Sequence, residues 1–263
     1  MIILKALVAL LSAITMILSA SPLNIAIPYL DVIPDIIDVG VDYIDLDFNM
    51  GAVTKAQIKK DIAESKASHP FVLATKSDFD KVRDEYKNGS FTEYTKALCD
   101  FVISNADGLL DKSIYPLMPY VLDEEDSILP ISREVINRMI ILGYAWQITG
   151  DNKYADRAWE ELENVCSYGD WCTSHFLATA EMALAVAVGY DWFYDYLSSQ
   201  QKNLLAEKTY EYALKPALSK NYFKNWFTWS KNNWNSICYS GVGIAAITFS
   251  SYYPDEAAEF LKM

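Results

Sequence analysis

Basic residues are scarce in this sequence of 263 residues. Lysine and arginine together number 22, against 35 aspartates and glutamates, which gives a formal net charge of −13 at pH 7. A chain of this charge repels polyanions such as duplex DNA, because its overall field is negative. We therefore expect no nucleic-acid partner.

Residues that commonly bind metals are also few. The chain has only 2 histidines and 4 cysteines, and no CxxC or mixed His/Cys ligand spacing. We therefore predict no metal site and no cofactor. Cys166 and Cys172 are close enough in sequence to form a disulfide in an oxidising compartment. The alternative is that these two, with Cys99 and Cys238, are small buried hydrophobic residues.

One apolar run stands at the amino terminus. Lys5 precedes an uncharged apolar stretch that begins at residue 6 and ends in Ser19-Ala-Ser21. This pattern is typical of a signal peptide over residues 1–20. The run is short for a transmembrane helix, so we expect cleavage and a secreted, periplasmic or cell-surface protein, with an uncleaved amino-terminal anchor as the alternative.

Helical patterns dominate the rest of the chain. Hydrophobic residues make up 52% of the sequence, which excludes wholesale disorder and supports a substantial core. Residues 21–68 mix prolines with acidic-apolar stretches and predict an irregular arm or short strands. Within 69–263, apolar residues recur at spacings of three and four, which predicts helices that include 132–148, 153–165, 173–197 and 202–214. Repeated inner and outer hairpins of helices, without a βαβ signal, favour an all-α fold: an incomplete α/α toroid of antiparallel helical hairpins.

Acidic residues fall within the apolar helix expected over 173–197. Glu181 and Asp191 must each be paired or partly solvated, because an isolated buried charge is costly. We expect Tyr190-Asp-Trp192 to tie adjacent helices together and His69 to be structural. The acidic cluster 123–126 is expected to be solvated surface.

A stretch near the carboxyl end lacks acidic residues and is rich in aromatic ones. No aspartate or glutamate occurs from Tyr212 to Pro254, whereas lysines stand at 215, 220, 224 and 231. Aromatic rings stack on the apolar faces of sugars, and lysines hold carboxylate or sulfate groups. We therefore predict binding of an acidic polysaccharide; the alternative is that these rings are simply core. The predicted substrate-binding residues are Trp226, Trp229, Lys231, Trp234, Asn235 and Tyr239.

Three asparagines stand just before a small-residue helix that begins near Ser236. Amides such as those of Asn232 and Asn233 can hydrogen-bond a uronate carboxylate and stabilise the charge that develops when the proton alpha to it is removed. The alternative is that the asparagines cap the helix. His175, at the start of the helix 173–197, is a candidate base or substrate contact.

These segments resemble the helical domain of heparinase II/III-like and alginate-lyase-like polysaccharide lyases. The resemblance covers about residues 69 to 263. It implies an α/α toroid, β-elimination of uronate-containing glycans, and neutralisation of the substrate carboxylate by Asn233 or Asn232, with Asn233 preferred. The segments that carry it are His69-Pro-Phe-Val-Leu-Ala74, Trp146-Gln-Ile-Thr-Gly-Asp-Asn-Lys-Tyr-Ala155, Phe176-Leu-Ala-Thr-Ala-Glu-Met-Ala-Leu-Ala185, Gly189-Tyr-Asp-Trp-Phe-Tyr-Asp195 and Asn232-Asn-Trp-Asn235.

The sequence departs from that family at its carboxyl end. In the family a tyrosine further along the toroid and a histidine, often from later in the chain, transfer protons, and β-sandwich domains follow. The sequence reaches Met263 before any such stretch, so the resemblance implies a truncated lyase that is inactive alone, with any structural metal in the part that is lacking. Two alternatives stay open: a non-catalytic glycan-binding or interaction helical repeat, and an α/α-toroid glycoside hydrolase with Asp191 as one of its two carboxylates.

Overall fold

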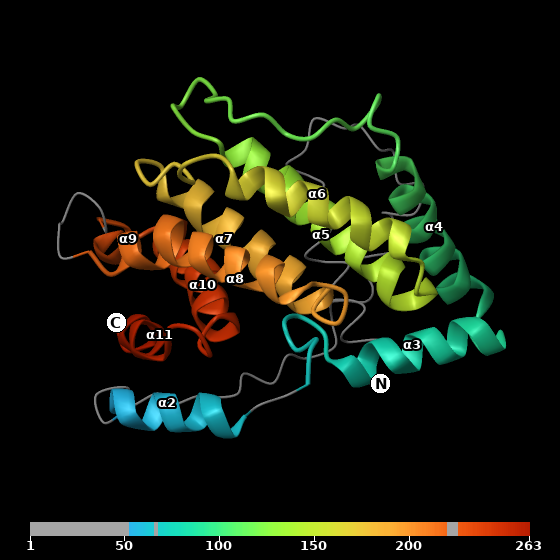
Figure 1. The fold of residues 1–263 in the computed structure, drawn as a ribbon, viewed down its shortest axis with the longest axis horizontal. Coiled ribbons are helices and arrows are strands. Elements are labelled where there is room, and N and C mark those ends of the chain that lie inside the picture. Colours follow the sequence, from blue (N-terminus) through green and yellow to red (C-terminus); the bar gives the residue numbers. More distant parts are fainter. Residues whose placement is uncertain (1–52, 66–67, 220–225) are drawn as a thin grey trace.

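The computed structural model describes residues 53–65, 68–219 and 226–263. All regular structure in these residues is helical, with nine α-helices of eight or more residues and no strand (Figure 1). The all-α prediction is therefore confirmed. The predicted signal peptide and the arm up to residue 52 lie outside the described residues. None of the helices described is long and apolar enough to span a membrane.

The central helix is α7 (Phe176–Trp192), in which 15 of 17 residues are buried. It packs between α5 (Leu129–Thr149) and α10 (Asn233–Thr248), and these two helix pairs have the most extensive contacts. The other helices lie around these three: α3 (Lys76–Asn88), α4 (Glu93–Leu109) and α6 (Asn152–Cys166) against α5, α8 (Ser199–Thr209) against α6 and α7, and α11 (Pro254–Leu261) against α10. Because α7 is apolar on nearly all sides, it can be covered by neighbours in every direction.

The prediction of an irregular arm over residues 21–68 is wrong for one segment, 55–64, which is helical. Helix α2 (Lys55–Glu64) begins after Thr54, whose side chain accepts a hydrogen bond from the first turn. It lies beside α11 (Figure 1), and Lys59 pairs with Asp255 of that helix at 2.6 Å. No residue of α2 is buried, so this helix does not need the apolar spacing from which helices were predicted. Its partner stands 196 residues later.

The four expected helices are present with shifted ends. Helix α7 stops at Trp192 rather than at residue 197, and α8 ends at Thr209, followed by a π-helical turn, Tyr210–Leu214, and the short α9 (Lys215–Ala217). Buried apolar side chains continue past the end of α7, since Phe193 is 1% exposed and Leu197 is 5% exposed. Apolar content therefore does not mark where that helix ends.

The carboxylate of Asp191, at the end of α7, holds the segment that leads into α3. Its Oδ2 accepts the backbone N–H groups of Phe71 and Val72, each at 2.7 Å, and its Oδ1 lies 2.5 Å from Nδ1 of His69. The indole of Trp192 donates to the carbonyl of Val72 at 2.7 Å. The sequence predicted that Tyr190-Asp-Trp192 joins adjacent helices and that His69 is structural. The motif does join two segments and His69 is structural, but the segment joined to α7 is the stretch before α3 rather than a second helix. Asp191 is fully buried, a setting that does not suit a hydrolytic carboxylate.

All four cysteines are buried free thiols. The Cys166–Cys172 disulfide that the sequence left open is therefore not formed, and the alternative of four buried hydrophobic residues is confirmed. Burial raises the pKa of the Cys166 and Cys238 thiols from 9.0 to about 12, because a thiolate is poorly solvated in an apolar interior.

Helices α7 and α10 touch backbone to backbone at Gly241. A Cβ atom on this residue would lie 2.3 Å from the carbonyl oxygen of Ala180 and 2.8 Å from its carbonyl carbon. Backbone atoms cannot rotate away as a flexible side chain can. Glycine is therefore required here for the two helices to pack at this distance.

We expect Gly241→Ala to lower the free energy of unfolding by about 1–3 kcal/mol, because the helices must separate to admit the methyl group. The control is Gly243→Ala on the same helix, where the added Cβ would lie 3.8 Å from its nearest neighbour, the ring of Phe260. This change should leave stability equal or raise it by up to ~1 kcal/mol, because alanine is the better helix former. Urea denaturation measures both; equal stability of the two variants would contradict the tight contact.

We also expect the four thiols to be unreactive in the native protein. A thiol reagent at pH 8 should label none of the four in the folded protein, because all are buried and Cys166 and Cys238 also stay protonated at that pH. In denaturant without a reducing agent, the same reagent should label all four. Mass spectrometry counts the labels. A pair of unlabelled cysteines in the unfolded, unreduced chain would show a disulfide.

Candidate functional site

Two of the asparagines before the small-residue helix build its start. Asn232 is the N-cap of α10, and its Oδ1 accepts the N–H of Trp234 at 3.0 Å and the hydroxyl of Ser230 at 2.6 Å. The amide of Asn235 donates to the carbonyls of Phe227 and Thr228 at 3.4 and 3.2 Å. These bonds hold the preceding 3₁₀ turn against α10. The capping alternative is therefore confirmed for Asn232, and α10 begins at residue 233, three residues earlier than expected.

Asn233 differs from Asn232 and Asn235 because its side chain is not used in a local hydrogen bond. It is the first residue of α10 and is exposed, and its side chain makes no hydrogen bond with any described residue. The N-terminal end of a helix carries partial positive charge and unpaired N–H groups. Its amide can therefore bind an oxygen-rich, negatively charged ligand there.

An aromatic cluster of His175, Trp226 and Trp234 joins the starts of α7 and α10. His175 is the residue before α7, and its ring centroid lies 4.7 Å from that of Trp234, the second residue of α10. Trp226, in the 3₁₀ turn Trp226–Trp229, lies 4.5 Å from Trp234 on the same measure. Three predicted site residues, of which His175 and Trp234 stand 59 positions apart in the sequence, are thus in contact. Trp234 directly follows Asn233 in the chain.

The other predicted substrate-binding residues are not part of this cluster. Trp229 is 72% exposed and Lys231 is exposed, so both are accessible to a ligand. Tyr239 points into the core, where its ring lies 5.7 Å from that of Phe227 and 5.6 Å from that of Phe260, and burial raises its pKa. We therefore treat Tyr239 as a core residue rather than a ligand contact. Lysines 220 and 224 lie outside the described residues.

A carboxylate that sequence reasoning did not connect with this site lies beside His175. Oε2 of Glu125 is 3.9 Å from Nε2 of His175. The turn that carries Glu125 is fixed by Asp123, whose Oδ1 accepts the N–H groups of Glu125 and Ser127 at 2.9 and 3.0 Å. Nδ1 of His175 is buried with no hydrogen-bond partner among the described residues. The acidic cluster 123–126 is solvated surface as expected, since all four residues are exposed, and its member Glu125 is the one whose carboxylate lies near His175.

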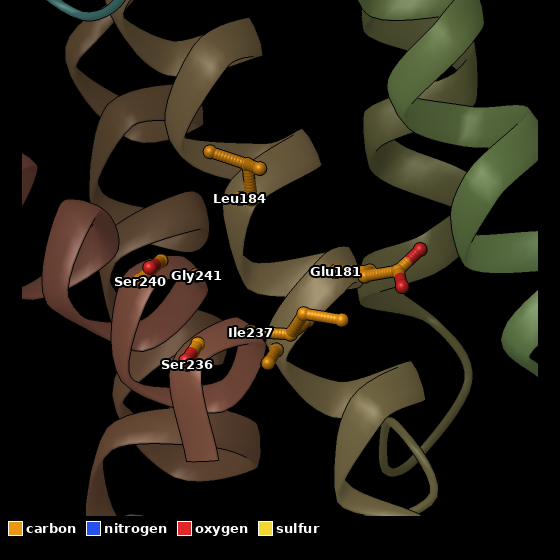
Figure 2. A pocket seen from close by; sticks show the side chains of 7 residues that line it. Glu181, Leu184, Ser236, Ile237, Ser240 and Gly241 are labelled. Carbon is orange, nitrogen blue, oxygen red and sulfur yellow. The ribbon is translucent and has the colours of Figure 1, made fainter. Parts of the chain in front are cut away.

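A cavity of about 270 Å³ lies between α7 and α10 (Figure 2). Its lining is mainly apolar and is made by Ala180, Leu184, Ile237 and Gly241 together with Glu181, Ser236 and Ser240. The carboxylate of Glu181 points away from the two serines (Figure 2).

Glu181 is anchored from the far side. Nε and Nη2 of Arg133, on α5, donate to its two oxygens at 3.0 and 3.2 Å, and its side chain is 16% exposed. The sequence indicated that Glu181 needed a partner, but the identity of that partner depends on how α5 packs against α7.

The electrostatics of the site differ from those that the sequence suggested. The stretch 212–254 has no acidic residue, yet Glu125 and Glu181 reach the same region from two distant parts of the chain. We therefore describe the site as mixed in charge rather than cationic. In the described part of the chain, no group of three histidines, cysteines or carboxylates is arranged to hold a metal.

We expect the two neighbouring asparagines to respond differently to alanine. Asn232→Ala should lower the free energy of unfolding by about 1 kcal/mol, because the first turn of α10 loses its cap. Asn233→Ala should leave it unchanged or slightly higher, because an exposed helical residue becomes a better helix former. Urea denaturation of both variants tests this; equal losses would mean that Asn233 is also structural.

No protein-family model matches the sequence, and no curated protein sequence is significantly similar to it. The function must therefore be argued from the site itself, together with the short motifs that resemble polysaccharide lyases.

Proposed function

We propose that this chain is the α/α-toroid part of a secreted polysaccharide lyase that cleaves uronate-containing glycans by β-elimination. The arrangement of α5, α7 and α10 side by side, each with further helices packed against it, supports a toroid. The exposed, uncommitted amide of Asn233 beside the aromatic cluster is the observation on which the proposal rests.

Asn233 neutralises the substrate carboxylate in this proposal. Removing the proton alpha to a uronate carboxylate moves negative charge onto the carboxylate oxygens, and preorganised donors stabilise that charge. The amide N–H of Asn233 is such a donor, and the positive end of the α10 dipole adds to its effect. Asn232 and Asn235 support it indirectly, because their hydrogen bonds fix where α10 starts.

Aromatic and basic side chains position the glycan. Trp229, 72% exposed, offers a face for an apolar sugar surface. Lys231 lies two residues before Asn233 and supplies a positive charge for a carboxylate or sulfate. Trp234 and Trp226 form the wall between these groups and His175.

His175 is the candidate base. In β-elimination a base takes the proton alpha to the carboxylate, the resulting electron pair forms the carbon–carbon double bond, and the bond to the leaving sugar oxygen breaks. In the lyases that the sequence resembles, a tyrosine further along the chain takes part in proton transfer, and such a group would give the leaving oxygen its proton. Nε2 of His175 faces outward toward Glu125, while Nδ1 is buried. A substrate that displaces Glu125 would therefore meet Nε2.

A non-catalytic glycan-binding module is the second candidate. It is favoured by Glu125, which occupies the open side of His175, and by the use of Asn232 and Asn235 in local structure. Turnover by this chain would exclude the non-catalytic module, whereas binding alone is common to both candidates.

We expect the chain to bind unsulfated uronate oligosaccharides in calorimetry and to lose most of that affinity in Asn233→Ala, by about 10- to 100-fold, because a hydrogen bond to a charged group is lost. Trp229→Ala should weaken binding by about fivefold through lost stacking. Asn203→Ala, an exposed position on α8, is the control and should bind as the wild type does.

The same oligosaccharides test turnover through the near-ultraviolet absorbance of an unsaturated uronate. Absorbance that rises with the wild type and not with Asn233→Ala supports a lyase. Binding that depends on Asn233 without any absorbance is the expected result both for a toroid part that is inactive alone and for the non-catalytic module. Absence of binding by the wild type would overturn both candidates.

A further inference from the structure

One asparagine, Asn88, has the sequence pattern of a glycan attachment site. It is followed by Gly89 and Ser90, and Asn-X-Ser or Asn-X-Thr, with any residue but proline at X, is the acceptor pattern for N-glycosylation. No other asparagine in the sequence has a serine or threonine two positions further on. Because so short a pattern also occurs by chance, attachment further requires an exposed, uncommitted side chain with space around it.

Asn88 is the last residue of α3, and the turn after it leaves its side chain unused. The helix is closed by Gly89, whose backbone is left-handed (φ 66°, ψ 25°) and whose N–H donates to the carbonyls of Glu85 and Tyr86. The N–H of Ser90 donates to the carbonyl of Glu85 at 3.1 Å. Because backbone groups close the helix, the amide of Asn88 is not needed as a cap, and it makes no hydrogen bond with any described residue.

The surroundings of this turn are open. Residues 87–90 are all exposed, and a Cβ atom on Gly89 would have no atom within 4 Å beyond its neighbours in the chain. The two buried residues of α3, Phe79 and Val82, lie more than one helical turn before its end. An oligosaccharide is bulky and polar and must stay in solvent, so the fold provides the space that this modification needs.

The other described asparagines differ from Asn88 in sequence, in structure or in both. The side-chain amides of Asn105 and Asn164 donate to backbone carbonyls, each at 2.7 Å. Asn233 is exposed and uncommitted, as Asn88 is, but it lacks a hydroxyl residue two positions later. Asn88 is therefore the one described asparagine at which the acceptor pattern coincides with an uncommitted, exposed amide.

This position lies away from the candidate functional site. The end of α3 that leads into α4 is at the right of the molecule in Figure 1, whereas α10 lies left of its centre. Helix α3 packs against α5 and not against α10. An oligosaccharide at Asn88 therefore leaves Asn233 and the aromatic cluster accessible.

We propose that Asn88 carries an N-linked oligosaccharide, which it receives from a lipid-diphosphate donor when the chain is exported. The amide nitrogen of Asn88 bonds to the anomeric carbon of the first sugar, and the bond from that carbon to the phosphate oxygen breaks. The lipid diphosphate leaves, and a base of the transferase takes the amide proton. This modification does not depend on the proposed glycan cleavage or binding; it requires export, which the signal-peptide pattern of residues 1–20 predicts.

The test is mass spectrometry of the protein purified from its native host. We expect the peptide that contains Asn88 to carry the added mass of an oligosaccharide, and the peptide that contains Asn233 to carry none. An exported protein in which Asn88 is unmodified would overturn the inference. A protein that is not exported would overturn it too, because the donor and the transferase act on exported chains.

Three substitutions expressed in the same host test whether the acceptor pattern directs attachment. Asn88→Gln should lose the added mass completely. Ser90→Ala should lose it as well, although Asn88 is kept, because the hydroxyl is part of the pattern. Ser90→Thr keeps a hydroxyl and should keep the added mass. An oligosaccharide that persists in Ser90→Ala would contradict the inference.

The Ser90 variants keep the turn that closes α3. Oγ of Ser90 makes one hydrogen bond, to the carbonyl of Glu85 at 3.3 Å, and the N–H of residue 90, which donates to the same carbonyl, is present in both variants. Urea denaturation of unglycosylated protein should therefore give them the midpoint of the wild type, so that a lost mass reports attachment rather than misfolding. An oligosaccharide at Asn88 in a protein that binds no uronate oligosaccharide would support this inference and leave the proposed function wrong.

Discussion

The site depends on the close packing of α7 against α10 at Gly241 and Ala180. Because the backbones touch there, the starts of the two helices are held together, and His175 meets Trp234. Ala180 and Gly241 also line the cavity between the two helices. A side chain at residue 241 would change both the aromatic cluster and the cavity, so one small residue controls the geometry of the candidate site.

Buried charges hold the segments that surround these helices. Asp191 fixes the chain before α3 by accepting two backbone N–H groups. The Oε1 atom of Glu161 similarly joins Arg138 of α5 and Arg157 of α6, at 2.6 and 2.5 Å, and both arginines donate to carbonyls of the loop before α5. The hydrogen bonds between these charges offset part of their desolvation, while Nε and Nη1 of Arg157 and Oε2 of Glu161 are buried without a hydrogen-bond partner among the described residues. That loop carries Glu125, so the network also helps to place a charge at the site.

Much of the fold follows from local patterns. The helices appear where apolar spacing predicted them, because burying one face of a helix requires that spacing. The ends were less accurate: α7 is shorter than predicted because apolar residues continue into the following turn. Helix α2 was missed because it is stabilised by charges on α11 and buries no residue of its own.

For the site, the sequence by itself determined which residue types were available: the asparagines of 232–235, the aromatic residues around them and the absence of acids from 212 to 254. Only the tertiary structure decided how they are used. It assigns Asn232 and Asn235 to hydrogen bonds with nearby backbone and leaves Asn233 exposed. It also turns Tyr239 into the core and brings Glu125 and Glu181 to the site from distant segments. Spacing along one helix fixes which side chains share a face, whereas the charge at a site depends on every segment that packs around it.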